Sequence, residues 1–147
     1  MNRIINAGKQ FIIGTSLAAG FLLLQPGIAS AGNISVASMK GTWQMTLDGQ
    51  TGCGQDSMLA TFTLDQVGKA NDMTLVGHAQ CGDSTAQNLT FEINSLSSNG
   101  SGTASLSCGN DCGWNLTIQV NPDGNSFNAV DVVNPGNFVS GMAIRQK

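Results

Sequence analysis

The sequence predicts an all-β protein, and more narrowly an eight-stranded antiparallel up-and-down (meander) β-barrel. Three observations lead to this fold class. Short stretches of alternating apolar and polar residues recur along the chain, clusters of Gly, Asn, Asp and Pro separate them, and residues 32–147 show no helical repeat of apolar residues. Alternation with a period of two is typical of strands that have one buried and one solvated face.

The N-terminal residues 1–31 have the features of a signal peptide. Arg3 and Lys9 give a basic start, the apolar run Phe11–Leu24 follows, and Ala29-Ser30-Ala31 is the small-x-small pattern that signal peptidases cleave. The apolar run is too short to favour a permanent membrane span. We therefore expect a secreted or periplasmic protein, cleaved after Ala31, with no membrane span after processing.

The first strand signal after this segment is Gly41–Leu47, in which Trp43, Met45 and Leu47 fall on one face and polar residues on the other. Further stretches along the chain alternate in a similar way. The predicted strands are Met39–Asp48, Ser57–Asp65, Asp72–Gln80, Ala86–Leu96, Gly102–Cys108, Gly113–Val120, Ser126–Val133 and Phe138–Arg145.

The same alternation assigns an inward face to the later strands, and turn residues with positive φ or a preset corner separate them. In chain order, the expected inward residues include Met58, Ala60, Phe62 and Leu64, then Met73, Leu75, Gly77 and Ala79, then Leu89, Phe91 and Ile93, then Ala104 and Leu106, and then Trp114, Leu116, Ile118 and Val120.

The short links between these strands decide how the sheet protects its edges. A long meander with one apolar face can fold into a sandwich or close into a barrel. A Greek key needs a long crossover connection, and no link here is long enough. Closure into an up-and-down barrel is therefore favoured over a sandwich.

The mature chain, residues 32–147, is acidic and is expected to form a single domain. Removing Arg3 and Lys9 leaves four basic side chains against nine acidic ones, which is a net charge of −5. A basic stripe is absent, so nucleic acid is not an expected partner.

Gly41-Thr42-Trp43 on the first strand, together with Arg145 at the end of the last, resembles the signature of the calycins, the family of lipocalins and avidins. The resemblance implies that Trp43 plugs the closed end of the barrel and that Arg145 packs across it. An even number of strands brings these two residues to the same rim, and a guanidinium group stacks well on an indole ring. Biotin binding is not implied, because avidin's polar contacts have no counterparts here. The outline also resembles small bacterial inhibitors of secreted metalloproteases, which are eight-stranded barrels whose N-terminal tail blocks the enzyme.

The mature chain contains four cysteines, and an even number in an exported protein indicates disulfides. In a meander, Cys53, Cys81, Cys108 and Cys112 all fall in links at the open end, opposite Trp43. Three pairings are possible, of which we favour Cys53–Cys81 with Cys108–Cys112. The alternatives are a four-thiolate metal site and a redox-active Cys108–Cys112 pair; an oxidising compartment disfavours the first and the spacing disfavours the second.

The same rim holds four acids, Asp48, Asp56, Asp83 and Asp111, and none of the basic residues of the mature chain. One interpretation is an electronegative mouth that attracts a cationic ligand. The other is that Asp is a common turn residue that keeps loops soluble. The candidate ligand-binding residues of the mouth and interior are Asp48, Asp56, Ala79, Asp83, Asp111 and Trp114.

Catalytic residues are scarce. His78, the only histidine, is expected to point outward, and Asp131 is the one acid expected to face a wall or the interior. A Ser/His/Asp group, paired carboxylates or a phosphate loop cannot be assembled from the sequence. We therefore predict a protein that is not an enzyme and that needs neither a metal nor a cofactor.

These observations favour an exported binding barrel that holds a small apolar or amphipathic ligand at its open end. An eight-stranded barrel has room for one small ligand or for its own side chains, and several expected inward residues are small. The alternative is a protein-interaction barrel, such as a protease inhibitor, that uses its N-terminal tail Gly32–Ser38 or its mouth loops.

Overall fold

The structure is a computed structural model that describes residues 33–107, 113–131, 136 and 138–147. The chain forms a closed antiparallel barrel in which each strand pairs with the next and the last pairs with the first. The elements are a 3₁₀ helix η1 (Val36–Met39) and the strands β1 (Gly41–Thr51), β2 (Gly54–Leu64), β3 (Lys69–Ala79), β4 (Gly82–Leu96), β5 (Ser101–Ser107), β6 (Gly113–Val120), β7 (Ser126–Asp131) and β8 (Phe138–Arg145).

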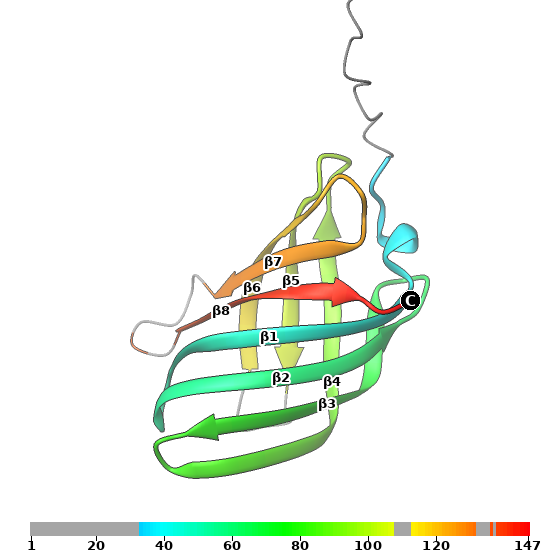
Figure 1. Cartoon of the computed structure of the whole chain (residues 1–147). Coiled ribbons are helices and arrows are strands. Elements are labelled where there is room, and N and C mark those ends of the chain that lie inside the picture. Colours follow the sequence, from blue (N-terminus) through cyan, green and yellow to red (C-terminus); the bar gives the residue numbers. More distant parts are fainter. Residues whose placement is uncertain (1–32, 108–112, 132–135, 137) are drawn as a thin grey trace, which may run out of the picture.

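This topology confirms the predicted all-β, eight-stranded meander and its closure into a barrel. Figure 1 shows β8 lying beside β1, which closes the sheet, and Trp43 on β1 pairs with Arg145 on β8. Closure satisfies the backbone of both strands that would otherwise be free edges. Within the described residues, no helix is long and apolar enough to cross a membrane.

Burial alternates along the strands as the apolar pattern predicts. The inward side chains fill a single core, and Trp43, Phe91 and Phe127 are the largest that are fully buried. The three rings pack in series, since the centroid of Phe127 lies 5.2 Å from that of Trp43 and 6.1 Å from that of Phe91. The barrel is therefore held by aromatic packing that crosses its interior.

The predicted start of the first strand was wrong. Met39, expected to begin it, instead ends η1, and β1 begins at Gly41. The side chain of Met39 is fully buried, and its carbonyl oxygen accepts a 2.8 Å hydrogen bond from Trp43 Nε1. Ser35 and Ser38 cap the helix by exchanging side-chain and backbone hydrogen bonds. The turn thus folds down onto the ring that plugs the barrel.

Strand β4 begins at Gly82, four residues earlier than predicted, and its pairing is irregular. The polar residues Asp83, Ser84 and Thr85 all pair with β3, although they lack an apolar alternation. Further along, the register shifts against β3, and Asn88 adopts a positive φ of 57°. The extra residue of this β-bulge allows both Ala86 and Leu89 to face the core.

The two ends of the barrel differ. The closed end carries η1, Trp43 and the C-terminus, and η1 lies beside the C-terminus in Figure 1. The open end carries the β1–β2 and β3–β4 hairpins. A disulfide between Cys53 and Cys81 joins these two hairpins, with 5.3 Å between the Cα atoms. The predicted pairing of Cys108 with Cys112 falls outside the described residues.

Candidate functional site

The inner face of the open end is lined by small residues along four strands. Cross-strand pairing places Gly49, Asp56, Ala79 and Gly82 in one row over β1 to β4. Asp56 is the only member of this row with a side chain longer than that of Ala. Paired residues of an antiparallel sheet point to the same face, so this carboxylate has a small cross-strand neighbour on either side, Gly49 and Ala79.

Asp56 is incompletely satisfied by hydrogen bonds. Its Oδ2 accepts a 3.4 Å bond from Thr51 Oγ1, whereas Oδ1 is buried and finds no partner among the described residues. Gly77, on the neighbouring strand, lies beside this oxygen, since a Cβ built there would be in ordinary van der Waals contact with Oδ1 at 3.4 Å. A buried carboxylate oxygen without a donor is costly. Asp56 is therefore a candidate to bind a ligand.

Trp114, the second residue of β6, carries the matching donor. Its side chain is 8 % exposed, and its Nε1 has no hydrogen-bond partner among the described residues. In the closed order, β6 stands four strands from β2, so Trp114 and Asp56 belong to opposite walls of the open end.

Asp131, on β7, is also buried, as expected for an acid that faces the interior.

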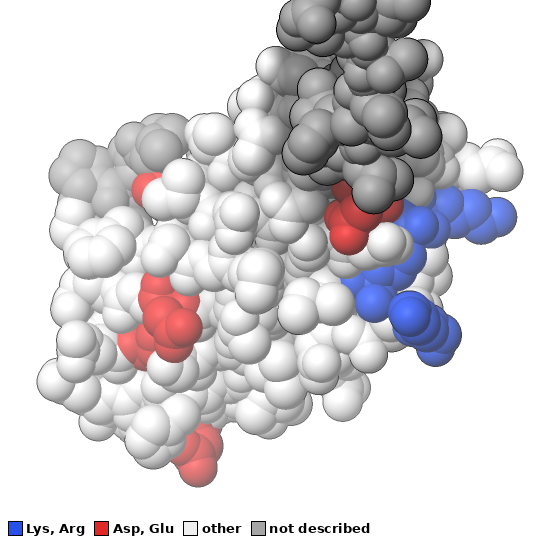
Figure 2. Space-filling model, turned by 45° about the horizontal axis from the view of Figure 1, so that its top comes forward, with Lys and Arg blue, Asp and Glu red and all other residues white. Residues whose placement is uncertain are grey.

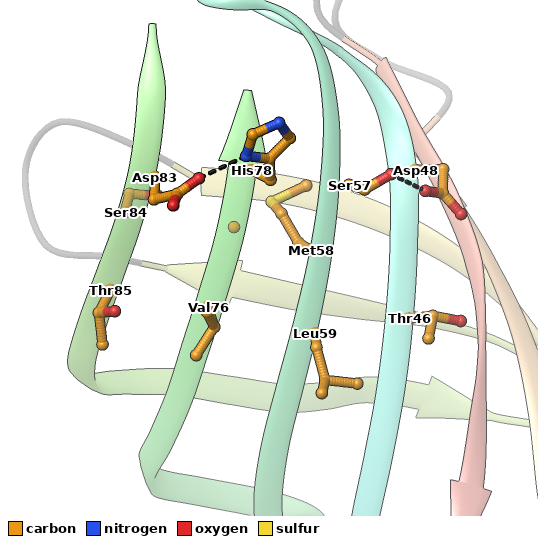
Figure 3. Close-up of a pocket in the computed structure, with 11 residues that line it drawn as sticks. Thr46, Asp48, Ser57, Met58, Leu59, Val76, His78, Asp83, Ser84 and Thr85 are labelled. Atoms are coloured by element: carbon orange, nitrogen blue, oxygen red, sulfur yellow. Dashed lines mark hydrogen bonds and ion pairs between the residues drawn. The ribbon is translucent and has the colours of Figure 1, made fainter. Parts of the chain in front are cut away.

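The outer wall of the same end carries a second set of polar residues. Asp48, Ser57, His78 and Asp83 are consecutive partners across β1, β2, β3 and β4. Ser57 donates a hydrogen bond to Asp48, and His78 Nδ1 pairs with Asp83, as the dashed lines in Figure 3 show. The hydrogen bond to Asp83 and its charge raise the pKa of His78 above its ordinary value.

This row corrects one conclusion from the sequence, because it does bring a serine, a histidine and an aspartate together. Cross-strand pairing makes Ser57, His78 and Asp83 neighbours although Ser57 lies far from the other two in sequence. The arrangement nevertheless lacks the hydrogen bonding of an activated nucleophile, since the hydroxyl of Ser57 donates to Asp48. His78 and Asp83 are also each 82 % exposed, so the pair is surrounded by water.

The predicted mouth residues therefore separate into two surfaces. Asp56, Ala79 and Trp114 face the interior, whereas Asp48 and Asp83 lie on the outer wall. The role of each in binding stays a prediction, and Asp111 falls outside the described residues. Ser57 and His78 were missed as site residues, and the signal that could have found them is the two-residue turn between Ala79 and Gly82, which sets His78 opposite Asp83.

Charge is distributed unevenly between the ends. Figure 2 shows the Lys and Arg side chains gathered at one end of the molecule and most of the visible Asp and Glu side chains away from it. The basic residues at the closed end include Lys69, which pairs with Glu92 at 2.9 Å, and Arg145. This separation gives the open end a negative potential.

Metal ligation has little support at the open end. Within the described part of the chain, no three His, Cys, Asp or Glu side chains are placed to hold a metal ion. Cys53 and Cys81 are joined to each other, which removes two ligands from the four-thiolate alternative.

Comparisons with known proteins define the class of this chain by its fold. No family model matches the sequence, and no curated protein matches it significantly. Among solved structures it is similar to a de novo designed fluorescence-activating β-barrel, with a TM-score of 0.51 and 17 % identity over 77 % of this chain and 99 % of that one. The chain is thus a small antiparallel β-barrel, and at this identity the likeness concerns the fold alone.

Proposed function

We propose that this protein is an exported binding barrel that holds one small ligand inside its open end. Three buried polar atoms have no partner among the described residues, and two of them, Asp56 Oδ1 and Trp114 Nε1, carry the proposal because they lie on opposite walls of that end; the third, Arg145 Nε, is at the closed end. Buried polar atoms in native proteins are nearly always hydrogen-bonded, so such a pair is typical of a site whose ligand completes it.

The chemistry of these atoms defines the ligand. Asp56 requires a hydrogen-bond donor and Trp114 Nε1 requires an acceptor, while Gly77, Ala79 and the half-buried Ala86 offer apolar surface between them. The ligand is therefore a small amphipathic molecule with an apolar body and both kinds of polar group. The similar designed barrel is described as fluorescence-activating. An eight-stranded barrel has room for one small ligand, which supports a compact occupant.

Export of the protein is part of the proposal. The basic start, apolar run and cleavage pattern of residues 1–31 support it. The Cys53–Cys81 disulfide is compatible with a periplasmic or extracellular location, where such bonds persist. Binding is proposed and catalysis is not, because the one Ser/His/Asp row found in the described residues directs its serine hydroxyl to Asp48.

We further propose that the closed end is built on the calycin plan that Gly41-Thr42-Trp43 and Arg145 resemble. Two contacts support this proposal. The guanidinium carbon of Arg145 lies 4.9 Å from the centroid of the Trp43 ring, and Trp43 Nε1 is bonded to the backbone of η1. The resemblance to calycins concerns how Trp43 and Arg145 close the barrel, and it implies no ligand.

The tail-type protease inhibitor is the less favoured alternative. Part of the expected tail is held on the barrel, since Ile34 is buried, Val36 begins η1 and the carbonyl of Ser38 accepts a bond from Arg145. Deleting residues 33–38 is therefore expected to lower the stability of the barrel rather than to release an inhibited partner.

The binding proposal can be tested with the neutral dye N-phenyl-1-naphthylamine, which becomes fluorescent in apolar surroundings. We expect saturable enhancement with the mature protein. Ala79→Leu should abolish it by filling the mouth, and Trp114→Phe should weaken it by removing the N–H donor. The matched control is Val130→Leu, an apolar enlargement on the outer wall of β7, which should leave the enhancement unchanged.

Equal binding of the dye to the wild-type protein and to Ala79→Leu would contradict the proposal. Circular dichroism melting of each variant separates loss of binding from loss of folding. Val76→Leu reports on the groove of the outer wall. If it changed binding and Ala79→Leu did not, the dye would be on the outer wall and the interior site would be rejected.

A further inference from the structure

The outer wall of the barrel carries a groove. It runs over β1 to β4, where two parallel rows of outward side chains flank Met58, Gly77 and Ser84. The polar row is Asp48, Ser57, His78 and Asp83, and the row beside it is Thr46, Leu59, Val76 and Thr85. Figure 3 shows the two rows one above the other, with the hydrogen-bonded pairs at the two sides.

The groove combines an apolar floor with concave shape. Leu59 and Val76 are direct cross-strand neighbours, and they remain 42 % and 54 % exposed. The hollow above them has a volume of about 810 Å³, which lies within the range of small-molecule sites. Two adjacent aliphatic side chains left in water gain free energy from any apolar group that covers them.

The charge of the groove determines whether a cation or an anion can bind there. Asp48 and Asp83 line it from opposite sides, and among the described residues that line it His78 is the one basic side chain, with no Lys or Arg. Ser57 donates to Oδ1 of Asp48, and His78 Nδ1 pairs with Oδ1 of Asp83. These bonds orient the two carboxylates and leave Oδ2 of each available to a ligand. An anion would be repelled here, whereas a cation would be attracted.

We propose that this groove is a second binding site, for a small organic cation with an apolar body. The ammonium group lies on the row of Asp48 and Asp83, and the apolar body covers Leu59 and Val76. Two residues along a strand separate the rows, which is roughly 7 Å, so charge and apolar body stand that far apart in the ligand. The described strands pair into a closed ring without a free edge, so the ligand engages side chains and not backbone.

Three matched probes test the site by nuclear magnetic resonance on protein with labelled Leu and Val methyl groups and labelled indole nitrogen. The probes are 4-phenylbutylamine, 4-phenylbutan-1-ol and 4-phenylbutyrate, which share the apolar body and differ in charge. We expect the amine to shift the methyl signals of Leu59 and Val76, the alcohol to bind more weakly, and the acid to have no effect. The indole signal of Trp114 reports the interior separately.

Two double variants with the same change in net charge complete the test. Asp48→Asn with Asp83→Asn should raise the dissociation constant of the amine roughly tenfold, since exposed ion pairs contribute up to about fivefold each. Asp72→Asn with Asp123→Asn, which lie outside the groove, should change it little. The site is rejected if the amine and the alcohol bind equally, if the two double variants behave alike, or if Leu59 and Val76 do not respond.

The outcome is independent of the interior site. A shift at Trp114 without one at Leu59 and Val76 would overturn the groove and leave the barrel's interior binding intact. The opposite result would support the groove and count against the interior.

Discussion

Arg145 lies over the ring of Trp43, with its guanidinium carbon 4.9 Å from the ring centroid. The two residues are direct partners across the β1–β8 seam, where the barrel closes. Arg145 Nη2 also donates to the carbonyl of Ser38 in η1, and Trp43 Nε1 donates to the carbonyl of Met39. One pair of side chains therefore joins the first strand, the last strand and the N-terminal turn.

Trp43 and Arg145 should consequently be coupled in stability. A double-mutant cycle with Trp43→Phe and Arg145→Ala is expected to give an interaction energy of about 0.5 to 2 kcal/mol in urea unfolding. Cation–π contact and the shared anchoring of η1 both contribute to it. An interaction energy near zero would contradict the proposed calycin-like plug. Trp43→Phe paired with Lys69→Ala, a basic residue whose partner is Glu92, is the control and should show additivity.

The β1–β8 seam should also depend on Gly141. A Cβ built at this position would overlap the backbone carbonyl of Thr46, and the φ angle is not positive, so only space is at issue. Gly141→Ala is expected to destabilise the barrel by about 1 to 3 kcal/mol, because the strands must separate to admit the methyl group. Gly52→Ala is the control, since a Cβ there meets nothing within 4 Å. Equal midpoints for both variants in urea would show that the seam is less tightly closed than described.

The Cys53–Cys81 bond should contribute strongly to stability. It closes a loop with a sequence separation of 28 residues, and the chain-entropy model gives about 3 to 4 kcal/mol for a loop of this length. Replacing both cysteines with serine should lower the free energy of unfolding by that order. The mature protein should carry a second bond between Cys108 and Cys112. With both bonds formed, its mass should be about 4 Da below that of the reduced chain. Two thiols that react with iodoacetamide before denaturation would disprove the second bond.

His78 should titrate above its ordinary pKa, because Asp83 is hydrogen-bonded to the ring and places a negative charge beside it. Since the folded pKa is the higher one, the contribution of this pair to stability is complete at pH values below the unfolded pKa. It is lost as the pH rises through the folded pKa. Following the His78 ring signals by nuclear magnetic resonance should show that Asp83→Asn lowers this pKa, whereas Asp72→Asn leaves it unchanged. An unaltered titration in Asp83→Asn would show that the pair does not form in solution.

The strand pattern could be predicted from the sequence wherever apolar residues alternate. The bounds of β6 and β8 match their predictions, because turn residues stand next to each. The start of β4 was missed since Asp83, Ser84 and Thr85 are held by pairing with β3 and not by an apolar face. The helix η1 was missed because a single capped turn has no repeat to reveal it.

The site could be predicted only in part. Grouping the rim acids by the link they adjoin placed Asp48, Asp56 and Asp83 at the correct end but ignored the direction of each side chain. The alternation does carry that direction, because Asp48 follows the inward Leu47 and Asp56 is two residues before the inward Met58. The orphaned atoms of Asp56 and Trp114 depend on packing in three dimensions, which alternation does not encode.

The central claim is that the open end of the barrel holds a small molecule. Native mass spectrometry of the protein, purified from its natural source without refolding, tests this claim most directly. We predict a mass in excess of the polypeptide that is released on denaturation and that is absent from Ala79→Leu purified in the same way. The account would be contradicted if the wild-type protein had only the mass of its oxidised chain and carried no more bound mass than Ala79→Leu.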